Sequence, residues 1–130
     1  MEYLCLVYLD EKQLGGLSKA EMQHLDRGSL EYDEELQRSG HRIVARALSD
    51  PKTAMSVRPR AGNVATTDGP FVETKEHLGG FILINAKDMN EALRIAAKIP
   101  VARFGGIEVR PTLNLERDSD GNVVLTGEGR

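Results

Sequence analysis

The residues best suited to acid–base chemistry lie in one short segment, residues 67–81, which contains a turn, a charged run and the start of an apolar strand. Asp68 could act as a general base or bind a cation, although an Asp before Gly69-Pro70 also commonly accepts backbone hydrogen bonds in a turn. His77 is the histidine best placed to carry a proton, because imidazole titrates near neutral pH and His77 lies beside this loop. The candidate catalytic residues are therefore Asp68 and His77.

Six polar side chains are candidates for contact with a ligand, and each also has a structural explanation. Ser29 interrupts an apolar helix face, where its hydroxyl could instead bond to a carbonyl of its own helix. Charged loop residues could line a site or lie in solvent, and a strand arginine could bind a carboxylate or form an ion pair, as between Arg110 and Glu108. The ligand-binding candidates are Ser29, Arg46, Asp68, Glu73, Lys75 and Arg110.

Several other classes of site are not indicated by the sequence. It contains no metal-ligand spacing, nucleophile elbow, phosphate loop or dinucleotide motif, so we predict neither a metal nor a cofactor. The single cysteine, Cys5, lies in an apolar run and is interpreted as a small core residue. The net charge is −3 and the basic residues are scattered, so nucleic acid is not an expected partner.

The length and hydropathy of the chain indicate one domain outside the membrane. A chain of 130 residues can bury a core of its own as a single unit. No apolar run approaches the roughly eighteen residues of a membrane span, and the N-terminus lacks the charge pattern of a signal peptide. We therefore expect a soluble, cytoplasmic protein without a membrane partner.

Strands are predicted from apolar runs and from alternation. Residues 3–9 and 81–84 are apolar throughout, which fits strands that are buried on both faces. Strands 42–48 and 53–58 are expected to pair as a hairpin around a turn at Asp50-Pro51. A short extended piece at 64–67 and an alternating strand at 107–115 complete the set, and Pro111 favours an edge position or a strand end.

Two helices are predicted from capping patterns. The first spans residues 19–38, between the capping box of Ser18 and Glu21 and the terminating Gly40. The second follows Asp88 and stops before Pro100. The expected apolar stripe of the first is Met22, Leu25, Ser29, Tyr32 and Leu36, and that of the second is Met89, Ala92, Leu93, Ala96 and Ala97.

The order of these elements predicts an α+β fold, a ferredoxin-like sandwich with an inserted loop or hairpin. Two helices can cover only one face of its sheet. Because strand 3–9 is apolar on both faces, we expect the other face to be buried against a second copy, giving a homodimer. The domain should span residues 1–116, followed by a polar tail or short hairpin over residues 117–130, where Asp120-Gly121 could form the turn.

Residues 67–81, with Asp68-Gly69-Pro70-Phe71 and Gly79-Gly80-Phe81, resemble the signature of the DGPF branch of the YCII-related family. The run Gly106-Ile107-Glu108-Val109-Arg110-Pro111 is also similar to that family, and the resemblance covers residues 1–115. It implies a dimeric α/β barrel with a cleft between sheet and helices or between two sheets. The other branch of the family is thought to use a histidine and an aspartate, but Ser29 and Ile99 occupy those positions here, so that pair is not carried over.

These observations lead to three hypotheses of function. The first is a protein that binds a small polar or anionic molecule in a cleft beside the Asp68-Gly69-Pro70-Phe71 loop. The alternative is an acid–base enzyme, such as an isomerase or a lyase, as the resemblance implies from relatives in the dimeric barrel group. The third is an interaction protein in transcriptional regulation, implied only because the family's domain is sometimes fused to sigma-factor-like regions.

Overall fold

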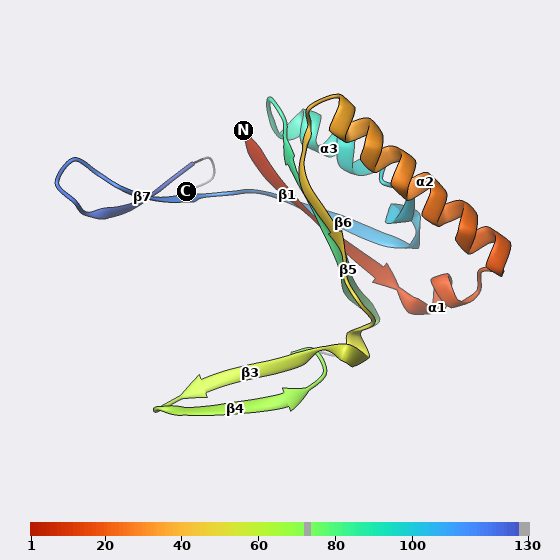
Figure 1. The fold of residues 1–130 in the computed structure, drawn as a ribbon, viewed down its shortest axis with the longest axis horizontal. Helices are drawn as coiled ribbons and strands as arrows, with labels where there is room; N and C mark the ends of the chain where they lie inside the picture. The colour runs from red at the N-terminus through yellow and green to blue at the C-terminus, as the bar shows by residue number, and fades with distance from the viewer. Residues whose placement is uncertain (72–73, 128–130) are drawn as a thin grey trace.

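The computed structural model describes residues 1–71 and 74–127, and it shows an α+β fold built on a four-stranded antiparallel sheet (Figure 1). The strand order is β2-β5-β1-β6. The strands are β1 (Glu2–Asp10), β2 (Arg42–Ala47), β5 (Glu76–Asn85) and β6 (Gly105–Pro111). Within the described residues, this sheet is open and is not closed into a barrel.

Two helices, α2 (Lys19–Arg38) and α3 (Met89–Ala97), cover one face of this sheet (Figure 1). The predicted bounds of α2 are confirmed, and its start has the expected capping box: the hydroxyl of Ser18 accepts from the Glu21 N–H, while the Glu21 carboxylate accepts from the Ser18 N–H. Asp88 caps α3 by accepting from a backbone N–H at 2.9 Å. A short helix, α1 (Glu11–Gly15), follows β1. None of the helices that the structure describes is long and apolar enough to cross a membrane.

The core lies between the sheet and these two helices. Tyr3, Cys5 and Ile84 are fully buried there. The prediction that Cys5 is a core residue is confirmed, and burial raises the pKa of its thiol to about 11. The prediction that Leu93 and Ala97 face the core was wrong, because both are exposed and Ile95 is buried instead. The buried stripe of α3 and the following residues is Ala92, Ile95, Ala96 and Ile99, at the 3-4 spacing of a helix.

Two further hairpins stand apart from the main sheet: β3 (Met55–Arg60) with β4 (Asn63–Asp68), and β7 (Asn114–Arg117) with β8 (Val123–Thr126). The expected hairpin between strands 42–48 and 53–58 was wrong, because β2 pairs with β5 and β3 pairs with β4. The tight turn lies instead at Ala61 and Gly62, whose φ angles of 48° and 80° are those of a two-residue hairpin turn. A 3-10 turn at Pro51–Thr53 separates β2 from β3.

The C-terminal part of the chain differs from the single strand expected over residues 107–115. β6 ends at Pro111 and, among the described strands, pairs only with β1, which confirms the edge position. The second hairpin then begins at Asn114, before the expected domain boundary at residue 116. Its turn is the one predicted at Asp120-Gly121, where the Asp118 carboxylate accepts two backbone N–H groups at 2.9 Å each.

The face of the sheet turned away from α2 and α3 has an apolar centre and charged edges. In one row of paired residues, Leu6 lies opposite Phe81 and Glu108, and Arg46 lies opposite Phe81. The next row consists of Arg110, Leu4, Leu83 and Val44. β1 is therefore fully buried only on its helix side within one chain, and its other face is partly exposed. We call this surface the open face.

Candidate functional site

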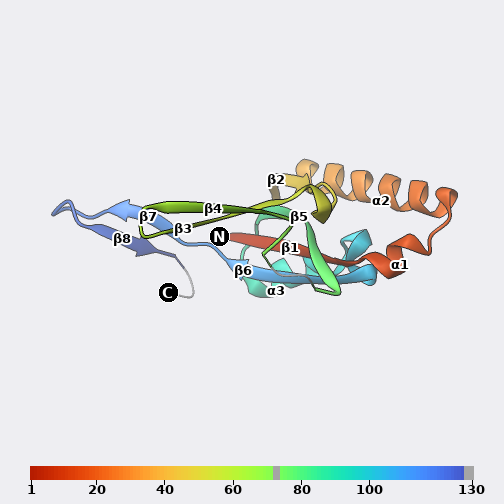
Figure 2. The same ribbon diagram turned by 90° about the horizontal axis from the view of Figure 1, so that it is seen from below.

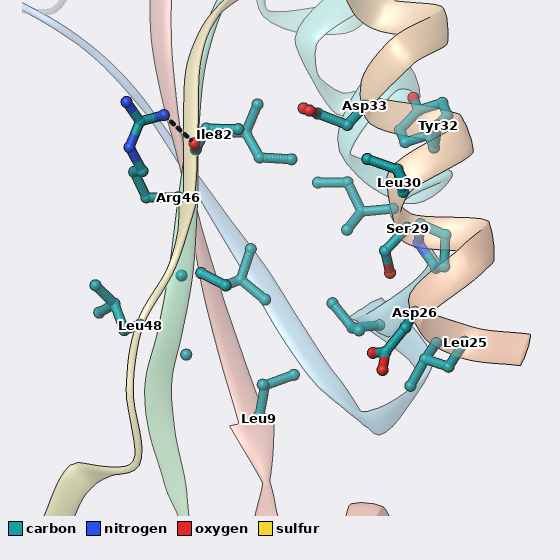
Figure 3. A pocket seen from close by; sticks show the side chains of 18 of the residues that line it. Leu9, Leu25, Asp26, Ser29, Leu30, Tyr32, Asp33, Arg46, Leu48 and Ile82 are labelled. Carbon is teal, nitrogen blue, oxygen red and sulfur yellow. Dashed lines mark hydrogen bonds between the residues drawn. The ribbon is translucent and has the colours of Figure 1, made fainter. Parts of the chain in front are cut away.

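A pocket of about 450 Å³ lies between α2 and one end of the sheet (Figure 3). Its floor is formed by strands β1, β2 and β5. Its roof is formed by the part of α2 from Met22 to Asp33. The turn after α3, which includes Ile99 and Val101, closes the far side. The lining is mostly apolar and includes Val7, Leu9, Met22, Leu25, Leu30, Ala45, Ala47, Gly80 and Ile82.

The pocket exists because the floor carries small residues beneath a long helix. Ala45 pairs with Ile82, and Ala47 pairs with Gly80, so small side chains dominate this end of β2 and β5. A Cβ atom at Gly80 would lie 2.8 Å from the backbone oxygen of Arg46, which is too close for backbone that cannot move aside. The close approach of β2 and β5 therefore requires glycine at this position and leaves space above it.

Ser29 is the polar side chain at the centre of the pocket roof. Its hydroxyl is directed into the pocket (Figure 3). The Oγ atom is buried and has no hydrogen-bond partner in the described part of the chain, so the bond to its own helix that one interpretation expected is not formed. A buried hydroxyl without a partner is uncommon in folded proteins, and here it is free to donate to, or accept from, a bound molecule.

Two carboxylates that the sequence reasoning missed flank Ser29 on the same helix face. Asp26 lies three residues before it and Asp33 four residues after it, and both line the pocket. Asp33 forms a close ion pair with Arg42, with 2.9 Å between Oδ1 and Nε, although the two groups are not aligned as a hydrogen bond. Asp26 is exposed at the mouth and has no ion pair among the described residues. The spacing of residues 26, 29 and 33, which puts them on one face of a helix, was the signal in the sequence that could have indicated these carboxylates.

Tyr32 separates the pocket from the core. Its ring lines the inner end of the pocket and packs against the core cluster, while its hydroxyl donates to the backbone oxygen of Ile95 at 2.7 Å. Burial, with a smaller contribution from the negative charge of Glu35, raises the pKa of this phenol to about 12. The hydroxyl is thus a structural donor that ties α2 to α3.

Of the ligand-binding candidates, Ser29 and Arg46 both border this pocket. The Ser29 side chain points into the pocket, whereas the Arg46 side chain points away from it. Figure 3 shows the Arg46 side chain on the far side of the strands from α2, and its Nη1 donates to the backbone oxygen of Ala45 at 2.6 Å. Arg110 forms the ion pair with Glu108 that one interpretation anticipated, at 3.7 Å between Nε and Oε2. Glu73 lies outside the described residues.

The candidates in the signature segment lie away from the pocket lining. Asp68 is the exposed last residue of β4. Lys75 pairs with the buried carboxylate of Asp10 at 3.7 Å and borders a shallow hollow of about 520 Å³, which Tyr8 and Glu108 also line. His77 is 4.0 Å from the Glu11 carboxylate, and neither His77 nor Asp68 lines the pocket.

The Asp68-Gly69-Pro70-Phe71 loop is tied to the β3–β4 hairpin. The hydroxyl of Ser56 donates to the backbone oxygen of Gly69 at 2.6 Å, and Gly69 has a φ of 91° that favours glycine. The guanidinium of Arg58 lies 4.5 Å from the centre of the Phe71 ring, in a cation–π contact. These contacts give Gly69 and Phe71 structural roles in holding the conformation of the loop.

Comparison with known proteins identifies the family of this chain. A family model for the YCII-related domain matches residues 1–116. The chain belongs to the YCII-related family. An uncharacterized protein of Rhizobium meliloti (strain 1021) is 34% identical to it over 113 residues, which cover 85% of this chain and 91% of that protein.

The pocket of this YCII-related chain includes both positions at which the resemblance places a histidine and an aspartate in the other branch of the family. Those positions are Ser29 and Ile99, and both line the pocket. Neither residue here can perform the proton transfer of that pair. Among the described residues, no group of three or more His, Cys, Asp or Glu side chains is arranged to hold a metal ion. The site is therefore equipped for hydrogen bonding and apolar contact.

Proposed function

We propose that this YCII-related protein binds a small, mostly apolar molecule in the pocket between α2 and the sheet. The observation that carries the proposal is the Ser29 hydroxyl, which is buried without a partner and directed into an apolar pocket of about 450 Å³. Such a volume is within the usual range for small-molecule sites, which are mainly apolar with a few convergent polar groups. A molecule with a hydroxyl or amine group would satisfy Ser29 while its apolar part fills the space above Gly80.

The charges around the pocket favour a neutral or cationic ligand. Asp26 and Asp33 line it, whereas Arg46 points away from it. The polar or anionic molecule expected beside the Asp68-Gly69-Pro70-Phe71 loop would find its cation elsewhere, at Lys75 in the shallow hollow. Acid–base catalysis in the pocket would have to use Asp26 or Asp33, because Asp68 and His77 do not line it.

The same proposal includes a ferredoxin-like fold and a homodimer. The strand order β2-β5-β1-β6, with α2 and α3 on one face, supports the ferredoxin-like arrangement, into which the β3–β4 hairpin is inserted. The apolar centre of the open face, formed by Leu4, Leu6, Phe81 and Leu83, supports burial against a second copy. Face-to-face packing of two such sheets would give the dimeric α/β barrel.

The ligand proposal is tested with two fluorescent probes that share one ring system, 1-aminoanthracene and anthracene-1-carboxylate. We expect the amine to bind saturably, with one site per chain, in a fluorescence titration. The carboxylate should bind about ten-fold more weakly, because Asp26, which has no ion pair among the described residues, repels it, whereas the charge of Asp33 is compensated by Arg42. A preference for the carboxylate would instead support the anionic ligand.

Two substitutions on α2 show whether the probe occupies this pocket. Ser29→Leu removes the free hydroxyl and fills part of the space, so it should abolish saturable binding of 1-aminoanthracene. Gln37→Leu adds a similar apolar side chain at an exposed position of the same helix that does not line the pocket, and it should leave binding unchanged. Equal binding by both variants, or no saturable binding by the wild type, would contradict the proposal.

A further inference from the structure

The two hairpins project from the main sheet on the side opposite α2 and α3 (Figure 1). Both also extend in the same direction along the long axis, away from the end of the molecule that carries α1 (Figure 2). Among the described strands, each hairpin pairs only within itself. A two-stranded hairpin is marginally stable in water by itself, so these hairpins are expected to be supported by packing on another surface.

The β3–β4 hairpin has one apolar and one cationic face. Its register places Met55 opposite Asp68, Val57 opposite Thr66 and Pro59 opposite Val64. Because side chains alternate along a strand, Met55, Val57, Pro59 and Val64 share one face, and Arg58 and Arg60 lie on the other. Val64 is 66% exposed and Met55 is 64% exposed. The apolar face is therefore left open to water in a single chain.

The β7–β8 hairpin has one largely aliphatic face, which also carries Arg117. Leu115 lies opposite Leu125, and Val123 lies opposite Arg117, so three aliphatic side chains share one face. On the other face, the hydroxyl of Thr126 donates to the Glu116 carboxylate at 2.9 Å. Leu115 is 74% exposed, although a large apolar side chain gains most from burial.

We infer that the two hairpins are arms that pack their apolar faces on a second copy of this chain, whose sheet lies on the open face. This inference rests on the homodimer proposed above and adds the surfaces that hold it. An object seated on the open face lies on the side toward which both arms project, so it would lie beside both hairpins.

A second copy fits this position because the same three surfaces are present on it. The row that crosses the open face has Arg46 at the β2 edge and Glu108 at the β6 edge. A two-fold axis parallel to the strands places each of these edges over the opposite edge of the other copy, so Arg46 of one copy would face Glu108 of the other, which also pairs with Arg110 of its own chain. Each copy then supplies two arms to its partner, and the exposed faces of four hairpins are buried in one assembly.

Matched substitutions on adjacent residues test the arms. Val64→Glu and Leu115→Glu place a charge on the apolar faces, whereas Ala65→Glu and Asn114→Glu place it on the opposite faces of the same strands. The dimer dissociation constant is measured by sedimentation and by native mass spectrometry. We expect it to rise about ten-fold or more for the first pair, because an unpaired charge would be buried, and to stay within about three-fold for the second pair. Equal dissociation constants for both pairs would overturn the inference.

Hydrogen exchange separates failure of the arms from failure of the dimer and does not depend on folding of the arm variants. In the wild-type dimer, amides of β3–β4 and β7–β8 should be protected. In Leu4→Glu, which places a charge in the open face, they should exchange rapidly while β1 and β5 stay protected. A wild-type dimer with unprotected hairpins would overturn the arms and leave the homodimer intact. A wild-type monomer at high concentration would overturn both.

Discussion

The two ends of the space between α2 and the sheet are built differently. At one end, Tyr3, Ile84 and Leu36 fill the space and α3 covers it, so each of these side chains is at most 4% exposed. At the other end, the strands carry Ala47 and Gly80, and a pocket lies beneath the same helix. Below, these regions are called the closed end and the pocket end. One helix thus contributes to a packed core and to a ligand site.

Tyr32 marks the boundary between the two ends and explains how they coexist. Its hydroxyl bonds to α3 through the backbone oxygen of Ile95, so α2 is fixed at the closed end and is held over the pocket by its own rigidity. A cavity reduces stability in proportion to the contacts that are lost, so it is retained more easily where another region anchors the helix. The closed end therefore carries the stability that the pocket end does not supply.

The largest difference between the two ends is expected from truncation of isoleucines on the same strand. Ile84→Ala should lower the free energy of unfolding by about 2–5 kcal/mol, because a fully buried side chain is replaced by a cavity. Ile82→Ala should cost about half as much, because Ile82 is partly exposed and already borders the pocket. Urea denaturation followed by circular dichroism measures both values.

The two isoleucine variants are matched in residue type, strand and side of the sheet. If Ile82→Ala costs as much as Ile84→Ala, then the space beneath α2 is occupied or closed in solution, and the distinction between the ends is lost. If both substitutions lower the free energy of unfolding only slightly, then the closed end does not anchor α2. The slope of the free energy of unfolding against urea concentration should be the same for both variants, because neither substitution changes the surface exposed on unfolding by much.

Most of the fold could be predicted because local patterns dictate it. The capping box at Ser18 and Glu21 determines where α2 begins, and the alternation after Gly106 determines which side of β6 meets the helices. The error in hairpin pairing arose because Asp50-Pro51 resembles a hairpin turn, whereas Ala61-Gly62 does not carry the Asn or Asp usual in that turn. Pairing between strands distant in sequence has no local signal of this kind.

The sequence reasoning expected a cleft beside the Asp68 loop, and Ser29 is the ligand-binding candidate that the structure directs into the pocket beneath α2. The place of Ser29 on an apolar face gave a local signal, but the space in front of it depends on Ala47 and Gly80, which come from strands that meet only in the folded chain. Arg46 was also named as a ligand-binding candidate, but the direction of its side chain depends on strand register, and a shift of one residue reverses the face. The charged residues of the signature segment attracted attention because of their composition, and those that the structure describes do not line the pocket, whereas Gly79, Gly80 and Phe81 at the end of the segment do.

A smaller effect is expected at the boundary between the two ends. Tyr32→Phe removes the donor to the Ile95 oxygen and should lower the free energy of unfolding by about 1 kcal/mol at neutral pH. The native pKa of about 12 exceeds the ordinary value of 10, so the unfolded chain loses this proton first as the pH rises. The contribution of Tyr32 is therefore complete below pH 10 and is lost between pH 10 and 12.

Denaturation of the wild type and Tyr32→Phe over a pH series isolates this contribution, because the two proteins differ only at this side chain. The stability difference between them should be constant from pH 7 to about pH 9 and should shrink above pH 10. A difference that grows with pH would show that the phenolate, rather than the phenol, is held in the native state. In that case Tyr32 would not be the donor that anchors α2 to α3.

The smallest effect on stability is expected at Ser29, and its sign is the informative part. Ser29→Ala removes a buried hydroxyl without a partner, so the free energy of unfolding should be unchanged or should rise by up to about 1 kcal/mol. Ser56→Ala is the matched control, because it removes a hydroxyl that donates to Gly69 and should lower stability by about 1 kcal/mol. If Ser29→Ala also destabilises the free protein, then its hydroxyl has a partner in solution. If it is neutral for stability but weakens 1-aminoanthracene binding, the hydroxyl is kept for the ligand, as the pocket end requires.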